Sequence, residues 1–252
     1  MGNEILDTIN RIKGCKADKT DKPQYKCEKC KDAKIIMVID GKGNLVARDC
    51  ECQAKATALR YMRMSGVSEM DLKKTIDDYK TFNESELKVA KVTAHNYMTR
   101  FRGIRYDRHN SLLLSGKPGT GKTMLGIAVV NNMLNDGIPA LYVSYREMIT
   151  SLKQLQYGEA SRFADEMNRY KNIDVLFVDD LFKGSESDAD KALMYDIINH
   201  RYLKGKPIII STEKTPDELI KVDEALGSRI IEMCKGYTVT FRNTENYRLR
   251  KE

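Results

Sequence analysis

From about residue 79 onward, short apolar runs alternate with longer stretches in which apolar residues recur at helical spacing. The short runs predict buried β-strands, and the longer stretches predict helices. The predicted strands cover residues 111–115, 140–143, 174–178, 207–211 and 237–241. The predicted helices cover residues 84–101, 124–134, 145–157, 161–170, 189–203, 215–226 and 228–234. Strands separated by helices predict an α/β fold of three layers, a central parallel sheet with helices on both faces.

The first 25 residues predict an amphipathic helix followed by a lysine-rich linker. Four apolar residues form a single helical stripe: Ile5, Leu6, Ile9 and Ile12. A lone stripe must pack against something, either the rest of the chain or a partner, and we favour the chain itself. The lysines of the first 34 residues form either a solvated face or a contact surface.

The next segment predicts a β-hairpin. Its strands, at 34–39 and 45–48, flank a turn rich in Gly and Asp. A helical stretch at 53–64 follows and ends before a Ser-Gly pair. We therefore predict two domains, an N-terminal module at 1–65 and an α/β domain at 66–252.

Composition narrows the class of protein. The chain has 252 residues and a net charge of +7, with a pI of about 8.9, which permits a nucleic-acid or acidic protein partner without requiring one. Its start lacks the basic and continuously apolar stretch of a secretory signal, and no apolar run approaches the ~20 residues of a membrane span. We expect a cytoplasmic protein with no membrane partner, in which paired cysteines are more often metal ligands than disulfides.

The segment from Gly116 to Thr123 carries the pattern G-x-x-x-x-G-K-[ST] of a phosphate-binding loop, or P-loop. Glycines let consecutive backbone N–H groups turn toward phosphate oxygens, and Lys122 would bind the β- and γ-phosphates. Thr123 would offer its hydroxyl to Mg²⁺ at the start of a helix whose positive end faces the anion. The predicted ATP-binding residues are Gly116, Lys117, Pro118, Gly119, Thr120, Gly121, Lys122, Thr123 and Met124.

Two carboxylates, Asp179 and Asp180, end the apolar strand that follows the P-loop by some 50–60 residues. Asp179 would hold Mg²⁺ together with Thr123, and Asp180 would orient or deprotonate the attacking water. We prefer this interpretation to a strand that ends in an ordinary polar turn, because the P-loop requires a second acidic site for the metal.

Ser211 and Thr212 end the next predicted strand at the same edge of the sheet, where ligands bind in open parallel sheets. A hydroxyl there can sense the γ-phosphate, and we favour Thr212. The alternative is a helix-capping or turn role, which Thr215 and Pro216 make plausible.

Four cysteines bracket the predicted hairpin in the order C-x-x-C and C-x-C: Cys27, Cys30, Cys50 and Cys52. Four thiolates suit a tetrahedral Zn²⁺, which would stabilise a module too small to be stable alone. The alternatives are reduced surface thiols or a redox pair. Cys15 is a spare ligand, and Cys234 is expected to be a packed apolar residue.

These motifs together resemble a known family. Asp179-Asp-Leu-Phe, Ile210-Ser-Thr and Leu226-Gly-Ser-Arg-Ile230 follow the P-loop in order, and a cysteine cluster precedes it. The chain resembles the DnaC/DnaI-type replicative helicase loaders, which are AAA+ ATPases of the initiator clade, and among them the phage-type members with an N-terminal zinc-binding module. The resemblance is strongest from about residue 79 to residue 241.

The resemblance implies further roles. Arg229 matches the arginine finger, which would reach the γ-phosphate of a neighbouring subunit and make activity depend on self-association. The two helices at 145–170 match the insertion that faces single-stranded DNA, with Tyr145 or Tyr157 as a stacking platform and basic residues tracking phosphates. The basic candidates are Arg146, Lys153, Arg162, Arg169 and Lys171. The segment 79–82 matches the one that lies over the adenine.

The chain departs from the family pattern at three places. Asp180 stands where many AAA+ enzymes have Glu, which makes slow hydrolysis plausible. Glu213 stands where many relatives have Asn, which blurs the assignment of the sensor. Only a short segment follows the last predicted strand, so the usual helical lid is absent or minimal, and Arg248 is a weak candidate for a second sensor.

We expect an ATP-dependent loader that delivers a hexameric replicative helicase onto single-stranded DNA, with the N-terminal module binding the helicase. Two alternatives stay open: a transposition helper ATPase of the IstB type, and a zinc-bearing adaptor that binds ATP without hydrolysing it. The expected cofactors are ATP, Mg²⁺ and Zn²⁺.

Overall fold

The computed structural model describes residues 25–64, 67–184 and 186–249. The chain divides into two compact units, residues 1–50 and residues 51–252. The predicted N-terminal amphipathic helix and Cys15 lie outside the described residues. The division differs from the predicted boundary at residue 65, because helix α2 (Glu51–Met64) packs against strand β4 (Ala140–Ser144) and helix α4 (Lys122–Asn135) of the second unit.

The first unit contains the predicted hairpin. Strand β1 (Ile35–Ile39) pairs antiparallel with β2 (Leu45–Asp49). In the turn between them, the Asp40 carboxylate accepts hydrogen bonds from the backbone N–H groups of Lys42 and Asn44 at 2.8 and 2.9 Å. These bonds, that from Asn44 above all, hold the pKa of Asp40 below its usual range.

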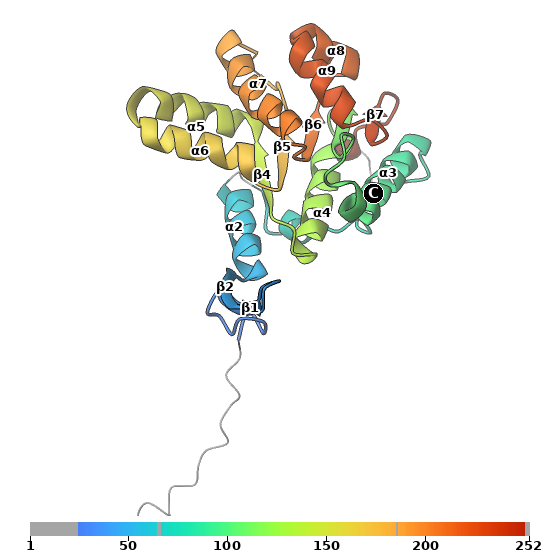
Figure 1. Cartoon of the computed structure of the whole chain (residues 1–252). Coiled ribbons are helices and arrows are strands. Elements are labelled where there is room, and N and C mark those ends of the chain that lie inside the picture. Colours follow the sequence, from blue (N-terminus) through green and yellow to red (C-terminus); the bar gives the residue numbers. More distant parts are fainter. Residues whose placement is uncertain (1–24, 65–66, 185, 250–252) are drawn as a thin grey trace, which may run out of the picture. The chain divides into compact units, whose positions relative to one another are not determined.

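A five-stranded sheet forms the centre of the second unit (Figure 1). Its strands are β3 (Leu112–Gly116), β4 (Ala140–Ser144), β5 (Val175–Asp179), β6 (Ile208–Thr212) and β7 (Thr238–Phe241). Their spatial order is β4-β5-β6-β3-β7, and every neighbouring pair is parallel. The predicted central parallel sheet is therefore confirmed, and the loops after β3, β5 and β6 leave the sheet at one edge.

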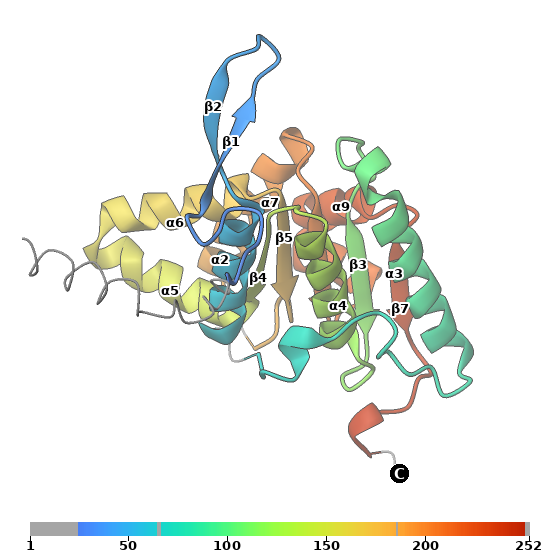
Figure 2. The same ribbon diagram turned by 90° about the horizontal axis from the view of Figure 1, so that it is seen from below.

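Helices cover both faces of this sheet (Figure 2). Successive side chains of a strand point to opposite faces of the sheet. Leu112 and Leu114 of β3 therefore lie in a core with α2, α3 and α4, whereas Leu113 lies in a second core on the opposite face. The second core contains residues of α5, α6, α7, α8 and α9. The bounds are α3 (Ser85–Ile104), α4 (Lys122–Asn135), α5 (Tyr145–Gly158), α6 (Ala160–Asn172), α7 (Asp188–Leu203), α8 (Pro216–Val222) and α9 (Glu224–Met233), with a short 3₁₀ turn η1 (Asp71–Lys73) before α3.

The helix break near the C-terminus lies at Asp223 and not at Gly227, where the sequence predicted it. The Asp223 side chain accepts a hydrogen bond from the backbone N–H of Leu226 at 2.8 Å and so caps α9. Gly227 lies inside α9, where a Cβ atom would approach the backbone of Ile220 to 2.7 Å. The glycine therefore permits close packing of α8 and α9 and does not end a helix.

Little regular structure follows β7 in the part of the chain that the structure describes. Up to residue 249, the single further element is the 3₁₀ turn η2 (Tyr247–Leu249). Among the described helices, none has the length and apolar character needed to cross a membrane.

Packing between α4 and β5 leaves no room for a side chain at Gly126. A Cβ atom there would lie 2.2 Å from the ring of Phe177, which is fully buried. We expect Gly126→Ala to lower the free energy of unfolding by about 1–2 kcal/mol, because the ring and helix must move apart. The measurement is urea unfolding followed by circular dichroism.

Gly103→Ala in α3 is the matched control. A Cβ atom at Gly103 has no neighbour within 4 Å, so the same substitution should raise stability by up to about 1 kcal/mol through helix propensity. Equal effects of the two substitutions would contradict the tight packing of α4 on β5.

Candidate functional site

The P-loop connects β3 to α4 at the carboxyl edge of the sheet. Three of its glycines have positive φ: Gly116 at 119°, Gly119 at 75° and Gly121 at 83°. A Cβ atom at Gly116 would lie 2.2 Å from the carbonyl oxygen of Phe241 in β7, so no larger residue fits there. No side chain caps the N-terminus of α4, which leaves its first N–H groups to an anion.

The Lys122 ammonium lies within this loop. It donates hydrogen bonds to the carbonyl oxygens of Gly116 and Lys117, both at 2.7 Å. Burial lowers the pKa of Lys122, while the carboxylates of Asp180 and Glu213 oppose that effect. A cation held in a partly buried loop beside open N–H groups is a suitable binding site for phosphate.

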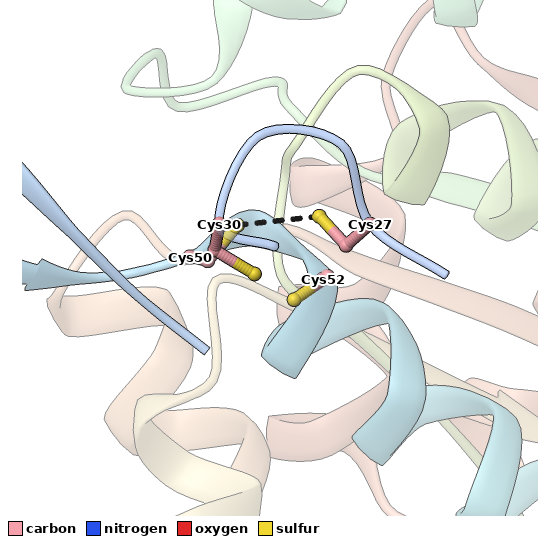
Figure 3. Close-up of side chains that lie close together, drawn as sticks. All are labelled: Cys27, Cys30, Cys50 and Cys52. Carbon is pink, nitrogen blue, oxygen red and sulfur yellow. Dashed lines mark hydrogen bonds between the residues drawn. The ribbon is translucent and has the colours of Figure 1, made fainter. Parts of the chain in front are cut away.

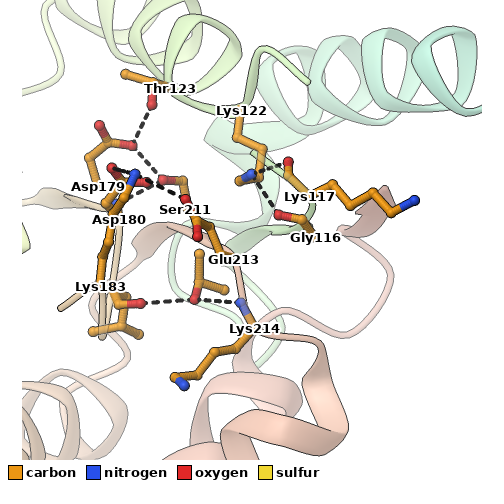
Figure 4. A network of polar contacts seen from close by, with 12 residues as sticks. Gly116, Lys117, Lys122, Thr123, Asp179, Asp180, Lys183, Ser211, Glu213 and Lys214 are labelled. Atoms are coloured by element: carbon orange, nitrogen blue, oxygen red, sulfur yellow. Dashed lines mark hydrogen bonds and ion pairs between the residues drawn. The ribbon is translucent and has the colours of Figure 1, made fainter. Parts of the chain in front are cut away.

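Asp179 is the centre of the hydrogen-bond network in Figure 4. Its carboxylate accepts hydrogen bonds from Thr123 Oγ1 at 3.0 Å, from Tyr142 Oη at 2.9 Å and from Ser211 Oγ. Burial raises the pKa of Asp179, although the three donors favour the charged form. The hydroxyl of Thr123 and the carboxylate of Asp179 are oxygen donors of the kind that Mg²⁺ prefers, so these residues fit the predicted metal site.

Asp180 begins the loop between β5 and α7 with an unusual backbone conformation, φ = 55°. Its backbone N–H donates to Ser211 Oγ at 2.9 Å. Its carboxylate oxygen Oδ2 lies 2.9 Å from the ammonium of Lys183, which also lies 2.9 Å from Glu213 Oε1. The sequence interpretation missed Lys183, because no motif marks it.

The predicted sensor residues are both fully buried. Ser211 is bonded to Asp179 and to the backbone of Asp180, as described above. The Thr212 hydroxyl donates to the carbonyl of Leu181 at 2.9 Å and accepts from the backbone N–H of Lys214 at 3.2 Å. This geometry favours the alternative turn role for Thr212 over direct contact with phosphate.

Aromatic residues lie on the other side of the loop. Tyr79 is buried, and its hydroxyl donates to the carbonyl oxygen of Thr120 at 2.9 Å. Phe82 forms an edge-to-face pair with Tyr247 at 4.9 Å, and the backbone N–H of Tyr247 donates to the carbonyl of Gly119 at 2.7 Å. The segment at 79–82 therefore adjoins the P-loop, as expected of a segment that covers a nucleotide base.

Glu86 holds the C-terminal segment in this place. Its carboxylate accepts hydrogen bonds from the backbone N–H groups of Arg242, Asn243 and Thr244 at 3.1–3.2 Å, and from the Thr244 hydroxyl at 2.6 Å. These bonds connect the start of α3 to the turn after β7. Tyr247 owes its position beside the P-loop partly to this carboxylate, which the sequence interpretation missed.

Arg229 lies on α9, and its hydrogen bonds are to groups other than the P-loop and Asp179. Its guanidinium donates to Asn199 Oδ1 at 3.0 Å and to the carbonyl of Ala225 at 2.6 Å. It also lies over the rings of Tyr195 and Tyr202, 5.2 and 5.5 Å from their centroids. The structure thus brings together the P-loop, Asp179 and Asp180, while Arg229 stays a prediction for contact with another subunit.

The two predicted helices of the insertion are present as α5 and α6. Tyr145 is buried and packs edge-to-face against Phe182 at 5.5 Å, so the prediction of Tyr145 as a stacking platform is wrong. Tyr157 is 90% exposed and stays available. Arg146 is exposed.

Four of the five basic candidates on these helices have acidic partners. Lys153 pairs with Asp190, Arg162 with Glu159, Arg169 with Glu166 and Lys171 with Asp196. Such pairs reduce the positive charge that the helical surface offers to a phosphate backbone. The geometry therefore supports a smaller DNA-facing set than the sequence predicted.

Comparison with known proteins identifies the family of this chain. Residues 31–252 match the model of the family described as "IstB-like ATP binding protein". Phage-like element PBSX protein XkdC of Bacillus subtilis (strain 168) is 34% identical over an alignment 260 positions long, gaps included, which covers 98% of this chain and 96% of that protein. The chain belongs to the IstB/DnaC-type family of AAA+ proteins.

Two further proteins are similar to this IstB/DnaC-type protein. Replicative helicase loader DnaC of Escherichia coli (strain K12) is 25% identical over 194 residues, 76% of each chain. The crystal structure of DnaI has a TM-score of 0.59 at 20% identity and covers 71% of this chain and 93% of that one. The likeness to DnaI shows that the two share a fold.

The four predicted zinc ligands form a cluster in this IstB/DnaC-type protein (Figure 3). Their sulfur atoms all lie within 4.8 Å of one another, and Cys30 and Cys50 are buried. Hydrogen bonds from Cys30, its backbone N–H first, lower the pKa of Cys27 to about 7. Cys234, by contrast, is fully buried in the second unit, and burial raises its pKa, as expected of a packed residue.

One sulfur–sulfur distance in the cluster equals that of a tetrahedral zinc site. Zn–S bonds of about 2.3 Å require sulfur atoms about 3.8 Å apart. The sulfur atoms of Cys27 and Cys50 are 3.8 Å apart. The donor set, the spacing and the lowered pKa of Cys27 fit Zn²⁺.

We expect Cys50→Ser to remove about one equivalent of zinc, because the remaining three thiolates hold the ion far less tightly. The measurement is metal content by atomic emission after dialysis of the purified full chain. Cys234→Ala should keep the full zinc content, because Cys234 lies outside the cluster. Zinc retained by Cys50→Ser, or lost equally by Cys234→Ala, would contradict the assignment.

Proposed function

We propose that this protein is an ATP-dependent loader of a hexameric replicative helicase onto single-stranded DNA. The observation that carries the ATP-dependent part of the proposal is the direct hydrogen bond between Thr123 of the P-loop and Asp179 of β5, which joins a phosphate loop to a candidate metal ligand. Similarity to the E. coli helicase loader DnaC supports the direction of the proposal.

The nucleotide chemistry uses residues at one edge of the sheet. Lys122 and the first N–H groups of α4 bind the β- and γ-phosphates. Thr123 and Asp179 would hold Mg²⁺, which would neutralise charge on the phosphates. Asp180 orients or deprotonates the attacking water, and its shorter side chain agrees with slow turnover.

The base would lie beside the aromatic residues near the loop. Phe82 is 46% exposed and adjoins Tyr247, which offers an apolar wall for adenine. Tyr79 supports the loop from below through its bond to Thr120 and is too buried to contact a base.

Single-stranded DNA would bind along α5, which carries Arg146 near its start and Tyr157 near its end. Tyr157 supplies an aromatic surface for base stacking, and Arg146 supplies charge that no described acidic partner neutralises. Two such residues per subunit make a weak contact, so binding would depend on several subunits acting together.

The hairpin of the first unit offers a surface for a protein partner. On one face, Ile35, Met37, Ile39 and Leu45 are all exposed, by 50–72%. An apolar strip of this kind fits a protein surface better than a phosphate backbone. We therefore assign helicase binding to this face of the zinc module.

The decisive experiment is co-purification of the full chain with the replicative helicase of its host. We expect the wild-type protein to retain the helicase, and Met37→Asp/Ile39→Asp to lose it, because two carboxylates would be buried against the partner. Both proteins should keep their zinc and their ATP affinity.

Arg48→Ala, on the opposite face of the hairpin, is the control and should retain the helicase. Failure of the wild-type protein to bind helicase would sink the proposed function. Loss with the control variant alone would place the contact on the other face.

A second prediction concerns the composite site. Lys122→Ala should bind no ATP, and Arg229→Ala should bind ATP but hydrolyse it on the order of a thousandfold more slowly. A mixture of the two should recover activity, because one variant supplies an intact P-loop and the other an intact Arg229. The measurement is phosphate release with single-stranded DNA.

Lys221→Ala on the neighbouring helix α8 is the control and should hydrolyse ATP normally. Thermal melting separates loss of folding from loss of catalysis, because Arg229 also packs on Tyr195 and Tyr202. Full activity of Arg229→Ala alone would rule out the finger role.

One alternative keeps specific support. The family description names IstB, which keeps the alternative of a transposition helper ATPase of the IstB type open. Parallel pull-downs with helicase and transposase distinguish these partners. Steady-state phosphate release distinguishes either enzyme from an adaptor that binds ATP without hydrolysing it.

A further inference from the structure

The turn that follows β5 has a rigid backbone. Leu181 and Phe182 are almost fully buried, and the backbone N–H of Leu181 donates to the carbonyl of Ser211 at 2.8 Å. The backbone N–H of Lys183 then closes the turn on the carbonyl of Asp180 at 3.0 Å. This anchoring directs the side chains of Asp180 and Lys183 toward the same edge of the sheet.

The Lys183 ammonium bridges two carboxylates there (Figure 4). It lies 2.9 Å from Asp180 Oδ2 and 2.9 Å from Glu213 Oε1, and its side chain is 51% exposed. It is also close enough to Lys122 for the two ammonium groups to repel each other. Lys122 and Lys183 therefore face the same phosphate-binding region from the P-loop and from the β5–α7 turn.

The charges around this region favour a second cation from the protein beside Lys122. Asp179, Asp180 and Glu213 are three carboxylates beside a loop that binds a polyanion, and a carboxylate cannot donate a hydrogen bond to phosphate. Lys183 has three N–H donors and pairs with two of these carboxylates. Ion pairs this exposed contribute little to stability, so the ammonium can exchange a carboxylate for a more highly charged phosphate at low cost.

We propose that Lys183 binds the γ-phosphate and thereby distinguishes ATP from ADP. The inference rests on the proposed function of the site as an ATP-binding site. On ATP binding, the ammonium exchanges a carboxylate contact for a γ-phosphate oxygen, with Glu213 keeping it in place. The exchange also frees Oδ2 of Asp180, so that this carboxylate meets the attacking water only when a γ-phosphate is present.

The test compares the affinities of the full-length protein for a non-hydrolysable ATP analogue and for ADP, both with Mg²⁺, by calorimetry. Lys183→Met should weaken binding of the ATP analogue by at least about tenfold, the value of one hydrogen bond to a charged group. Its ADP affinity should be unchanged, because ADP has no γ-phosphate. Lys183→Arg should retain most of the preference, because it keeps the charge and the donors.

Lys191→Met is the matched control. Lys191 pairs with Asp188 three residues earlier at 3.0 Å, in the same sequence arrangement as Lys183 and Asp180, but on α7 outside the site. It should leave both affinities unchanged. An equal loss for ATP analogue and ADP in Lys183→Met, or no loss for either, would overturn the proposal.

A charge-balanced variant tests the role of Glu213. Lys183→Met/Glu213→Asn removes one carboxylate and supplies an amide donor in its place, so it should recover part of the lost affinity for the ATP analogue. A double variant that binds the analogue no better than Lys183→Met would contradict the proposal. Absence of ADP and ATP binding in the wild-type protein would instead overturn the proposed function itself.

Discussion

The parallel register of β3, β5 and β6 is the constraint on which the nucleotide site depends. Three parallel neighbours end at one edge, and this brings Thr123, Asp179 and Ser211 into hydrogen-bond contact although they are far apart in the chain. The close packing of β3 on β7 adds a steric constraint, because Gly116 at the end of β3 contacts the backbone of Phe241 and leaves no room for a side chain. A shift of one residue in any of these strands would exchange the side chains that enter the two cores and would move the strand ends out of register with one another.

Charge balance is the second constraint on this edge. Asp179 is buried but accepts three hydrogen bonds from neutral hydroxyls, so it is satisfied without a cation from the protein. Asp180 and Glu213 are more exposed and share Lys183. The site thus has two parts. Asp179, which is surrounded by hydroxyl groups, can bind a metal, whereas Asp180 and Glu213, which pair with Lys183, lie where a phosphate can compete for the ammonium.

Sequence reasoning predicted elements with strong local signals and failed where a distant residue decides the outcome. The P-loop, the apolar strands and the cysteine pairs all have fixed spacing. The prediction that Tyr145 stacks on bases was wrong, because the burial of this ring depends on Phe182, which lies in the loop after β5. The predicted helix break at Gly227 was also wrong, because the close contact between this residue and α8 cannot be recognised from the neighbouring sequence.

By itself, the sequence determined the fold class, the phosphate-loop motif and the four cysteines that cluster, because loop conformation and cysteine spacing depend on residues close together in the chain. Only the tertiary structure decided which polar side chains at the sheet edge stay open to a nucleotide. Thr212 is occupied by the backbone of the β5–α7 turn, whereas Lys183 reaches the site from that same turn. The partners of Thr212 and Lys183 follow different strands of the sheet, so these contacts form only when β5 and β6 pair with each other.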